Sequence, residues 1–120
     1  MAKLVVLSDL HLISPEDRDQ ARIEDRRHFA LAWPSVREML ARIRDESPDL
    51  VISLGDLVDW YSTANRDFAC ELLQEMQTPW ITTPGNHDLA SSRTDEQAGG
   101  LDPAEQARRG WAEAGINLEN

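Results

Sequence analysis

Three short stretches of the sequence, SDLHL, GDLVD and GNHD, concentrate side chains that could bind a metal ion. Together they supply carboxylate oxygens, imidazole nitrogens and an amide oxygen, a mixture that suits manganese, iron or zinc better than calcium. Several carboxylates near one point would repel one another unless a cation lay among them. The polar residues in question are Asp9, His11, Asp56, Asp59, Asn86, His87 and Asp88. These residue types favour a metal site, provided that the fold brings the three stretches together.

The spacing of the polar residues within the stretches allows their side chains to bind the same ion. Asp9 and His11 are two residues apart, so their side chains share one face if the strand before them continues through both. Gly55 and Gly85 precede the polar residues of the second and third stretches, and the lack of a β-carbon allows close approach there. Each stretch alone is also compatible with a simple turn, but their joint occurrence favours the metal site.

Each stretch follows a short apolar segment that predicts a β-strand. These segments cover residues 3–8, 50–54 and 80–83, and continuous apolar runs of this length are typical of strands buried on both faces. The carboxyl ends of parallel strands lie side by side, and open α/β sheets bind ligands at that edge. We therefore expect the three stretches to converge at one edge of a sheet.

Amphipathic patterns predict helices within residues 34–48, 62–79 and 102–115, with a hydroxyl of Ser62 or Thr63 and the carboxylate of Asp102 as the expected N-caps of the last two. Strands and helices then alternate, which predicts an α/β fold, a parallel βαβαβα unit with right-handed crossovers. The segments 13–29 and 90–100 are charged or rich in small residues and lack an apolar face, so we expect surface loops there.

Length and composition are those of one globular domain covering residues 1–120. The chain has 22 acidic and 12 basic residues and a formal charge of -10, which disfavours nucleic acid and membrane surfaces as partners. Cys70 is the single cysteine, which excludes an internal disulfide and is expected to be a small core residue. The apolar runs are too short for a signal peptide or a membrane span, so we expect a cytoplasmic protein.

Other polar residues carry weaker signals. His28 follows no expected strand end, and we expect it to be a surface or packing residue. The same charged segment contains several arginines, which could reach a substrate phosphate but are more typical of a solvated surface. These are Arg18, Arg22, Arg26 and Arg27.

In this order, the three stretches resemble the first three motifs of the calcineurin-like metallophosphoesterases, and the resemblance extends from Lys3 to about Asp88. The longer stretches SPDLVISLGDLVDW and WITTPGNHD are most similar to the bacterial branch that includes cyclic-nucleotide phosphodiesterase-like proteins. The resemblance implies a phosphoesterase that hydrolyses a phosphomonoester or phosphodiester with a hydroxide activated by a dinuclear metal centre. The substrate itself is not specified by these motifs.

The resemblance also implies a set of metal ligands. Asp9 and His11 would bind one divalent ion, Asp56 would bridge both ions, and Asn86 would bind the second through its side-chain oxygen. Asp59 would contact the metal ligands without binding an ion itself. Manganese, iron and zinc all remain compatible with such a site.

The remaining two residues of the third motif have an implied catalytic role. His87 would lie near the substrate phosphate and assist catalysis, and Asp88 would orient it, so that the two side chains act as a hydrogen-bonded pair. A histidine in this role typically contributes about 100- to 10,000-fold to the rate.

Complete members of the family carry further histidine ligands and a second sheet after the third motif. Here no histidine follows Asp88, so we expect one weak metal site and one incomplete site. The chain resembles the first half of a four-layer α/β/β/α sandwich, and we expect a truncated domain, with a natural short form as the alternative. One face of the sheet should then be apolar and exposed, open to self-association or to a missing C-terminal half.

Three interpretations of the chain remain open at this point. It belongs to a phosphoesterase that is active in its full form, or it is a non-catalytic metal-binding or interaction module, or it is one part of a split enzyme that needs a partner chain. The motifs favour the first interpretation for the lineage, and the histidine count favours the other two for this chain alone.

Overall fold

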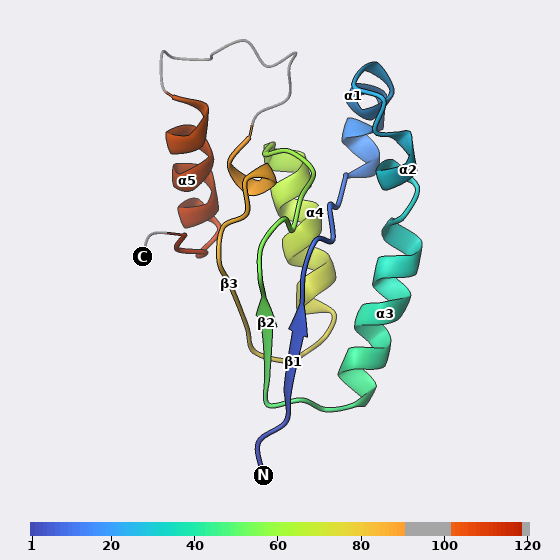
Figure 1. The fold of residues 1–120 in the computed structure, drawn as a ribbon, viewed down its shortest axis with the longest axis vertical. Helices are drawn as coiled ribbons and strands as arrows, with labels where there is room; N and C mark the ends of the chain where they lie inside the picture. The colour runs from blue at the N-terminus through green and yellow to red at the C-terminus, as the bar shows by residue number, and fades with distance from the viewer. Residues whose placement is uncertain (91–101, 119–120) are drawn as a thin grey trace.

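The computed structural model describes residues 1–90 and 102–118, and a three-stranded parallel sheet lies at the centre of this part (Figure 1). The strand order is β1-β2-β3, with Val6 of the first strand paired with Ile52 and Ile52 paired with Ile81. The strands are β1 (Leu4–Leu7), β2 (Leu50–Ser53) and β3 (Trp80–Thr82). The predicted α/β class with parallel strands is confirmed.

Long helices follow each strand, as the amphipathic patterns predict. The Ser62 hydroxyl accepts a hydrogen bond from the Asn65 backbone N–H at 3.0 Å, and the Asp102 carboxylate accepts one from Glu105 at 3.4 Å, so both predicted N-caps are confirmed. The helices are α3 (Trp33–Asp45), α4 (Thr63–Gln74) and α5 (Pro103–Glu113). Among the described residues, none of the helices has the length and apolar character that a bilayer crossing requires.

The prediction of a surface loop over residues 13–29 is wrong. That segment folds into short helices beyond the carboxyl ends of the strands, because Ala21 packs with Ile13 and Trp60 in a small separate core (Figure 1). Helices of one or two turns are too short to show a clear 3.6-residue period, so the sequence pattern misses them. They are η1 (Pro15–Asp17), α1 (Arg18–Ile23) and α2 (Arg27–Ala30). Most of the second expected loop, residues 91–100, lies outside the described residues.

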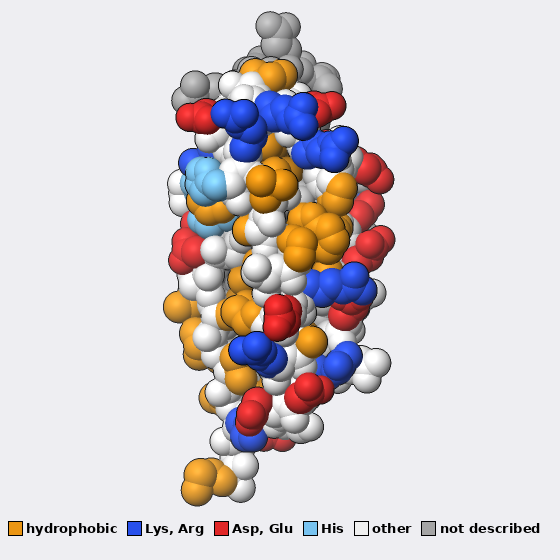
Figure 2. Space-filling model, turned by 90° about the vertical axis from the view of Figure 1, so that its right-hand side faces the viewer, with side chains coloured by type: hydrophobic (Ala, Val, Ile, Leu, Met, Phe, Trp, Pro, Cys, Tyr) orange, Lys and Arg blue, Asp and Glu red, His pale blue; other side chains and the backbone are white. Residues whose placement is uncertain are grey.

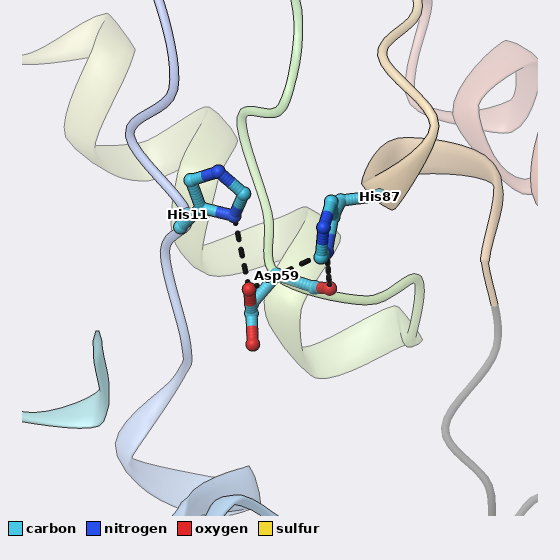
Figure 3. A group of neighbouring side chains, drawn as sticks. All are labelled: His11, Asp59 and His87. Atoms are coloured by element: carbon cyan, nitrogen blue, oxygen red, sulfur yellow. Dashed lines mark hydrogen bonds and ion pairs between the residues drawn. The ribbon is translucent and has the colours of Figure 1, made fainter. Parts of the chain in front are cut away.

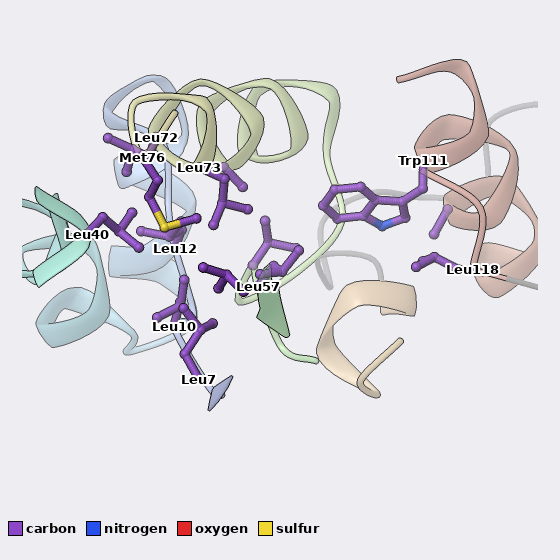
Figure 4. Close-up of a cluster of buried hydrophobic side chains, with 14 residues drawn as sticks. Leu7, Leu10, Leu12, Leu40, Leu57, Leu72, Leu73, Met76, Trp111 and Leu118 are labelled. Carbon is purple, nitrogen blue, oxygen red and sulfur yellow. The ribbon is translucent and has the colours of Figure 1, made fainter. Parts of the chain in front are cut away.

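The main core lies between the sheet and the helices α3 and α4, and it continues to Trp111 of α5 and to Leu118 (Figure 4). Leu40 of α3, Leu73 of α4 and Met76, which follows α4, are almost fully buried there, together with Val51 of β2. A buried side chain of this size stabilises the fold by roughly 1.5–3 kcal/mol relative to its exposed state. The core extends past the strand ends through leucines of the loops that follow them, so the same packing fixes the sheet and its carboxyl edge.

The opposite face of the sheet is open within the described part of the chain. Leu4, Val6 and Ile81 are each more than half exposed, and the strand register aligns Val6 with Ile52 and Ile81 on that face. The expectation that the strands are buried on both faces is therefore wrong for the described residues. The expectation of an apolar exposed sheet face is confirmed.

We predict that the isolated chain self-associates through this open face. The substitution Ile81→Lys should weaken the association, because it places a charge on this apolar surface. Sedimentation velocity over a range of concentrations measures the effect. The control is Met39→Lys, at a position that is 37% exposed on α3, away from the sheet. Equal association in Ile81→Lys and in the unmodified chain would contradict the prediction.

Candidate metal centre

The loops that follow the three strands meet at the carboxyl edge of the sheet. Backbone hydrogen bonds join the first loop to the second, from the Asp9 N–H to the Gly55 carbonyl at 3.1 Å and from the His11 N–H to the Asp56 carbonyl at 2.9 Å. The third loop joins them through the His87 N–H, which donates to Asp56 Oδ1 at 3.0 Å. The predicted convergence of the three motifs is confirmed.

The backbone at the expected metal ligands is left-handed. Asp9, His11 and Asp56 have φ angles of 60°, 46° and 54°. Strand β1 ends at Leu7 and does not continue through Asp9 and His11, so the condition for a face shared through strand geometry is not met. Residues other than glycine adopt this conformation at a cost of about 1–2 kcal/mol each. The hydrogen bonds between the loops offset this cost and bring the two side chains together by a different route.

Glycines allow the second and third loops to touch. A β-carbon on Gly85 would lie 2.1 Å from Asp56 Oδ1 and 2.5 Å from the Asp56 backbone nitrogen. Gly55 has a φ of +106°, and a β-carbon there would lie 2.6 Å from the Gly85 nitrogen. The predicted need for close approach at these positions is confirmed.

Asp9, His11 and Asp56 form a group that fits a divalent ion. Each offers one ligand atom, and these atoms lie within 4.8 Å of one another. His11 Nε2 is 3.5 Å from Asp9 Oδ1 and 3.9 Å from Asp56 Oδ2. Two ligand atoms bound to one ion at about 2.1 Å lie roughly 3.0–3.4 Å apart. Small movements of the side chains would therefore bring the three ligand atoms to the separations that a bound ion requires.

The charge state of Asp9 also suits metal binding. The Ser8 hydroxyl donates a hydrogen bond to Asp9, and this contact is the main reason why the pKa of the Asp9 carboxyl lies below its usual value. A carboxylate must be ionised to act as a ligand. The fold therefore favours the ionised form of Asp9 that a metal ligand needs.

The carboxylate of Asp59 contacts the imidazole ring of His11 (Figure 3). Its buried Oδ1 lies 2.9 Å from His11 Nδ1, so the Nδ1–H tautomer donates to the carboxylate and Nε2 stays free toward Asp9 and Asp56. This is the usual arrangement of a carboxylate behind a metal-binding histidine. The structure thus places Asp59 where its expected indirect role requires.

His87 contacts Asp59 and His11 (Figure 3). Its Nδ1 lies 2.7 Å from the Asp59 carbonyl oxygen, which can only accept, so Nδ1 carries the hydrogen. The imidazole rings of His11 and His87 meet edge to face, with centroids 4.6 Å apart. His87 Nε2 remains available to a ligand.

The nitrogen atoms of both imidazoles and the Asp59 carboxylate form a second group that could in principle hold a metal ion. The Nδ1 atoms of His11 and His87 lie 2.9 and 3.4 Å from Asp59 Oδ1, and both are already engaged by hydrogen bonds to Asp59. We therefore interpret the second group as a hydrogen-bonded support for the first.

Asp88 does not orient His87 in the way that the resemblance implies. Its carboxylate accepts hydrogen bonds from the backbone N–H groups of Asp56, Gly85 and Val58, at 2.8, 3.0 and 3.1 Å. The side chain is buried, and burial raises the pKa of Asp88 in spite of these donors. Asp59 replaces it as the partner of the His87 ring, and Asp88 instead ties the second loop to the third.

Asn86 lies between Gly85 and His87 at the start of η2 (His87–Leu89), and its side chain is exposed. Because the next backbone N–H is bonded to Asp56, Asn86 is held close to the expected bridging carboxylate. Its role as a ligand of a second ion stays a prediction.

Arg26, for which the sequence predicts no defined contact, binds Asp59. Arg26 Nε lies 2.8 Å from Asp59 Oδ2, and Nη2 lies 2.7 Å from Oδ1. Burial opposes ionisation of Asp59, but the hydrogen bonds and charge of Arg26 outweigh it, and the pKa of Asp59 lies below its usual value. The charged segment gave no signal that singles out this arginine from its neighbours.

Residues 2–117 match the family model described as calcineurin-like phosphoesterase. The chain therefore belongs to this family, whose members are metal-dependent hydrolases of phosphate esters. The resemblance that the three motifs suggested is confirmed. A comparison with curated proteins found no match.

We predict that Gly85→Ala destabilises the chain by about 1–3 kcal/mol, because the new methyl group overlaps the Asp56 backbone. Urea denaturation measures the loss. The comparison variant is Gly115→Ala, since Gly115 has a positive φ but open space around it, so that only a conformational cost of about 1 kcal/mol applies. A smaller loss in Gly85→Ala than in Gly115→Ala would be inconsistent with the close packing of the two loops.

Asp88→Asn should lower the free energy of unfolding by about 1–3 kcal/mol, because an amide cannot accept at both of its terminal atoms and leaves a buried N–H unpaired. Thermal denaturation followed by circular dichroism measures this change. Asp67→Asn on α4 is the control, since that carboxylate is 54% exposed. Equal melting temperatures for the two variants would show that Asp88 does not tie the loops together.

Proposed function

We propose that the chain carries a divalent metal site for phosphate ester hydrolysis, in which Asp9, His11 and Asp56 hold an ion. The observation that supports this most is the convergence of their ligand atoms, with His11 Nε2 left free because Asp59 engages Nδ1. The donor set of carboxylate and imidazole suits manganese, iron or zinc.

We further propose a dinuclear centre, in which Asp56 bridges to a second ion that Asn86 also binds. The contact between the His87 backbone and Asp56 supports this, because it holds Asn86 beside the bridging carboxylate. Among the described residues, no other side chain is assigned to this second ion. We therefore expect it to bind weakly, with water or a partner chain completing its ligands.

Bound divalent ions would neutralise the phosphate and lower the pKa of a water molecule that can attack it. The chain itself contributes the positioning of the ligands and of His87. Because Nδ1 of His87 donates to the Asp59 carbonyl, Nε2 is the atom that would contact the substrate or pass a proton to the leaving oxygen.

The proposed substrate is a phosphomonoester or a phosphodiester, including a cyclic nucleotide. With a formal charge of -10, the chain repels polyanions at long range, so bulk nucleic acid is the less favoured substrate. Binding of the phosphate group would depend on the metal ions.

The alternative is a non-catalytic metal-binding module or one part of a split enzyme. The small number of ligands for the second ion among the described residues supports it. Under this alternative the chain binds Mn²⁺ but does not hydrolyse esters without another chain.

Hydrolysis of p-nitrophenyl phosphate and bis(p-nitrophenyl) phosphate in the presence of Mn²⁺ tests the proposal. We expect slow release of nitrophenol that a chelator abolishes and that Asp56→Asn reduces by at least about 100-fold, because the bridging ligand is lost. Turnover equal in the two proteins would point to a contaminant. Mn²⁺ binding without any turnover would favour the alternative.

His87→Ala should lower turnover about 100- to 10,000-fold while Mn²⁺ binding stays nearly unchanged, because His87 is expected to contact the substrate and not the ion. Steady-state kinetics and the metal content of the purified variant check both parts. The control is His28→Ala, an exposed histidine outside the site, which should keep normal turnover. A joint loss of metal and turnover in His87→Ala would contradict this role.

A further inference from the structure

Arg26 makes a bidentate contact with a buried carboxylate beside the metal ligands. Both oxygens of Asp59 accept from its guanidinium, at 2.8 and 2.7 Å. The Asp59 side chain is 2% exposed and that of Arg26 is 31% exposed, so the pair is less screened by water than an ordinary surface ion pair. The planar fork of arginine fixes the plane of a carboxylate, which a lysine cannot do.

The position of Arg26 is itself fixed by the short helices. It lies at the junction of α1 and α2, where its backbone N–H donates to the Ala21 carbonyl at 2.6 Å. Its guanidinium carbon stands 4.4 Å from the centre of the Phe29 ring, and that ring packs against His11 at 4.9 Å between centroids. The segment that carries Arg26 therefore forms one wall of the site.

The contacts continue from Arg26 to His11 through a shared atom. Asp59 Oδ1 accepts from Arg26 Nη2 and from His11 Nδ1, so the orientation of this carboxylate decides which nitrogen of His11 keeps its hydrogen. Without Arg26 the carboxylate would lose the donors that fix its plane, and a free imidazole in water favours the opposite, Nε2–H tautomer. That tautomer would present a hydrogen to Asp9 and Asp56 in place of a lone pair.

We propose that Arg26 is a positioning residue of the metal centre, which orients Asp59 and thereby keeps His11 in the tautomer whose Nε2 can bind an ion. This inference rests on the proposed metal site. It gives a role to a residue that touches neither ion nor substrate.

The first test needs no metal. Long-range ¹H–¹⁵N spectra of the metal-free chain report the tautomer of each of its three histidines. We expect the Nδ1–H form for His11 in the unmodified chain and a mixture of both forms in Arg26→Met. The control Arg27→Met removes a neighbouring arginine that is 69% exposed, and it should leave the His11 signals unchanged.

The second test is the affinity for Mn²⁺, measured by calorimetry on the same proteins. Loss of a residue that orients a metal ligand typically weakens metal binding about 10- to 100-fold, and we expect Arg26→Met to bind Mn²⁺ at least about tenfold more weakly. Arg26→Lys keeps the positive charge but loses the paired N–H groups of the guanidinium. It should therefore give an intermediate mixture of His11 tautomers and an intermediate affinity for Mn²⁺. This variant also serves if Arg26→Met fails to fold.

A single Nδ1–H tautomer and normal Mn²⁺ affinity in folded Arg26→Met or Arg26→Lys would overturn the proposal. An Nε2–H tautomer in the unmodified chain would overturn it as well. Absence of phosphatase activity in every protein, with the expected tautomer change present, would count against the proposed function alone. The two proposals can therefore fail separately.

Discussion

The approach of three loops around Asp56 is the constraint on which the rest of the site depends. Its backbone carbonyl accepts from His11, its backbone N–H donates to Asp88, and its Oδ1 accepts from the His87 N–H. Gly85 lies against it so closely that no β-carbon fits between them. A single residue thus connects the ends of β1, β2 and β3, and its remaining carboxylate oxygen faces His11.

Burial divides the acidic residues of the site into two roles. Asp59 and Asp88 are buried and fully engaged with protein donors, whereas Asp9 is exposed and its pKa is lowered mainly by the Ser8 hydroxyl. Buried carboxylates without partners are costly, so the engaged pair acts as scaffold, and the proposed metal site uses the more accessible carboxylates.

Much of this arrangement could be predicted from the sequence, because strong local signals coincide. Apolar runs, caps such as Ser62 and the motifs at strand ends predict the alternating fold and the convergence of the ligands. The left-handed backbone at Asp9 could not be predicted, since it depends on hydrogen bonds to a loop more than forty residues away. The contact of Arg26 with Asp59 also joins distant parts of the chain, and the family resemblance implies Asp88 as the partner of His87 where the structure has Asp59.

The number of Mn²⁺ ions that the chain binds tests the proposed metal centre, and calorimetric titration measures it, with Asp56→Ala and the surface control Asp45→Ala for comparison. We expect at least one ion per chain, weakly held, with binding lost in Asp56→Ala and kept in Asp45→Ala. Tight binding of a second ion would show that the second site is more complete than its described ligands suggest. Undiminished binding in Asp56→Ala, or no binding in the unmodified chain, would contradict the proposal that Asp56 joins three loops into a metal centre.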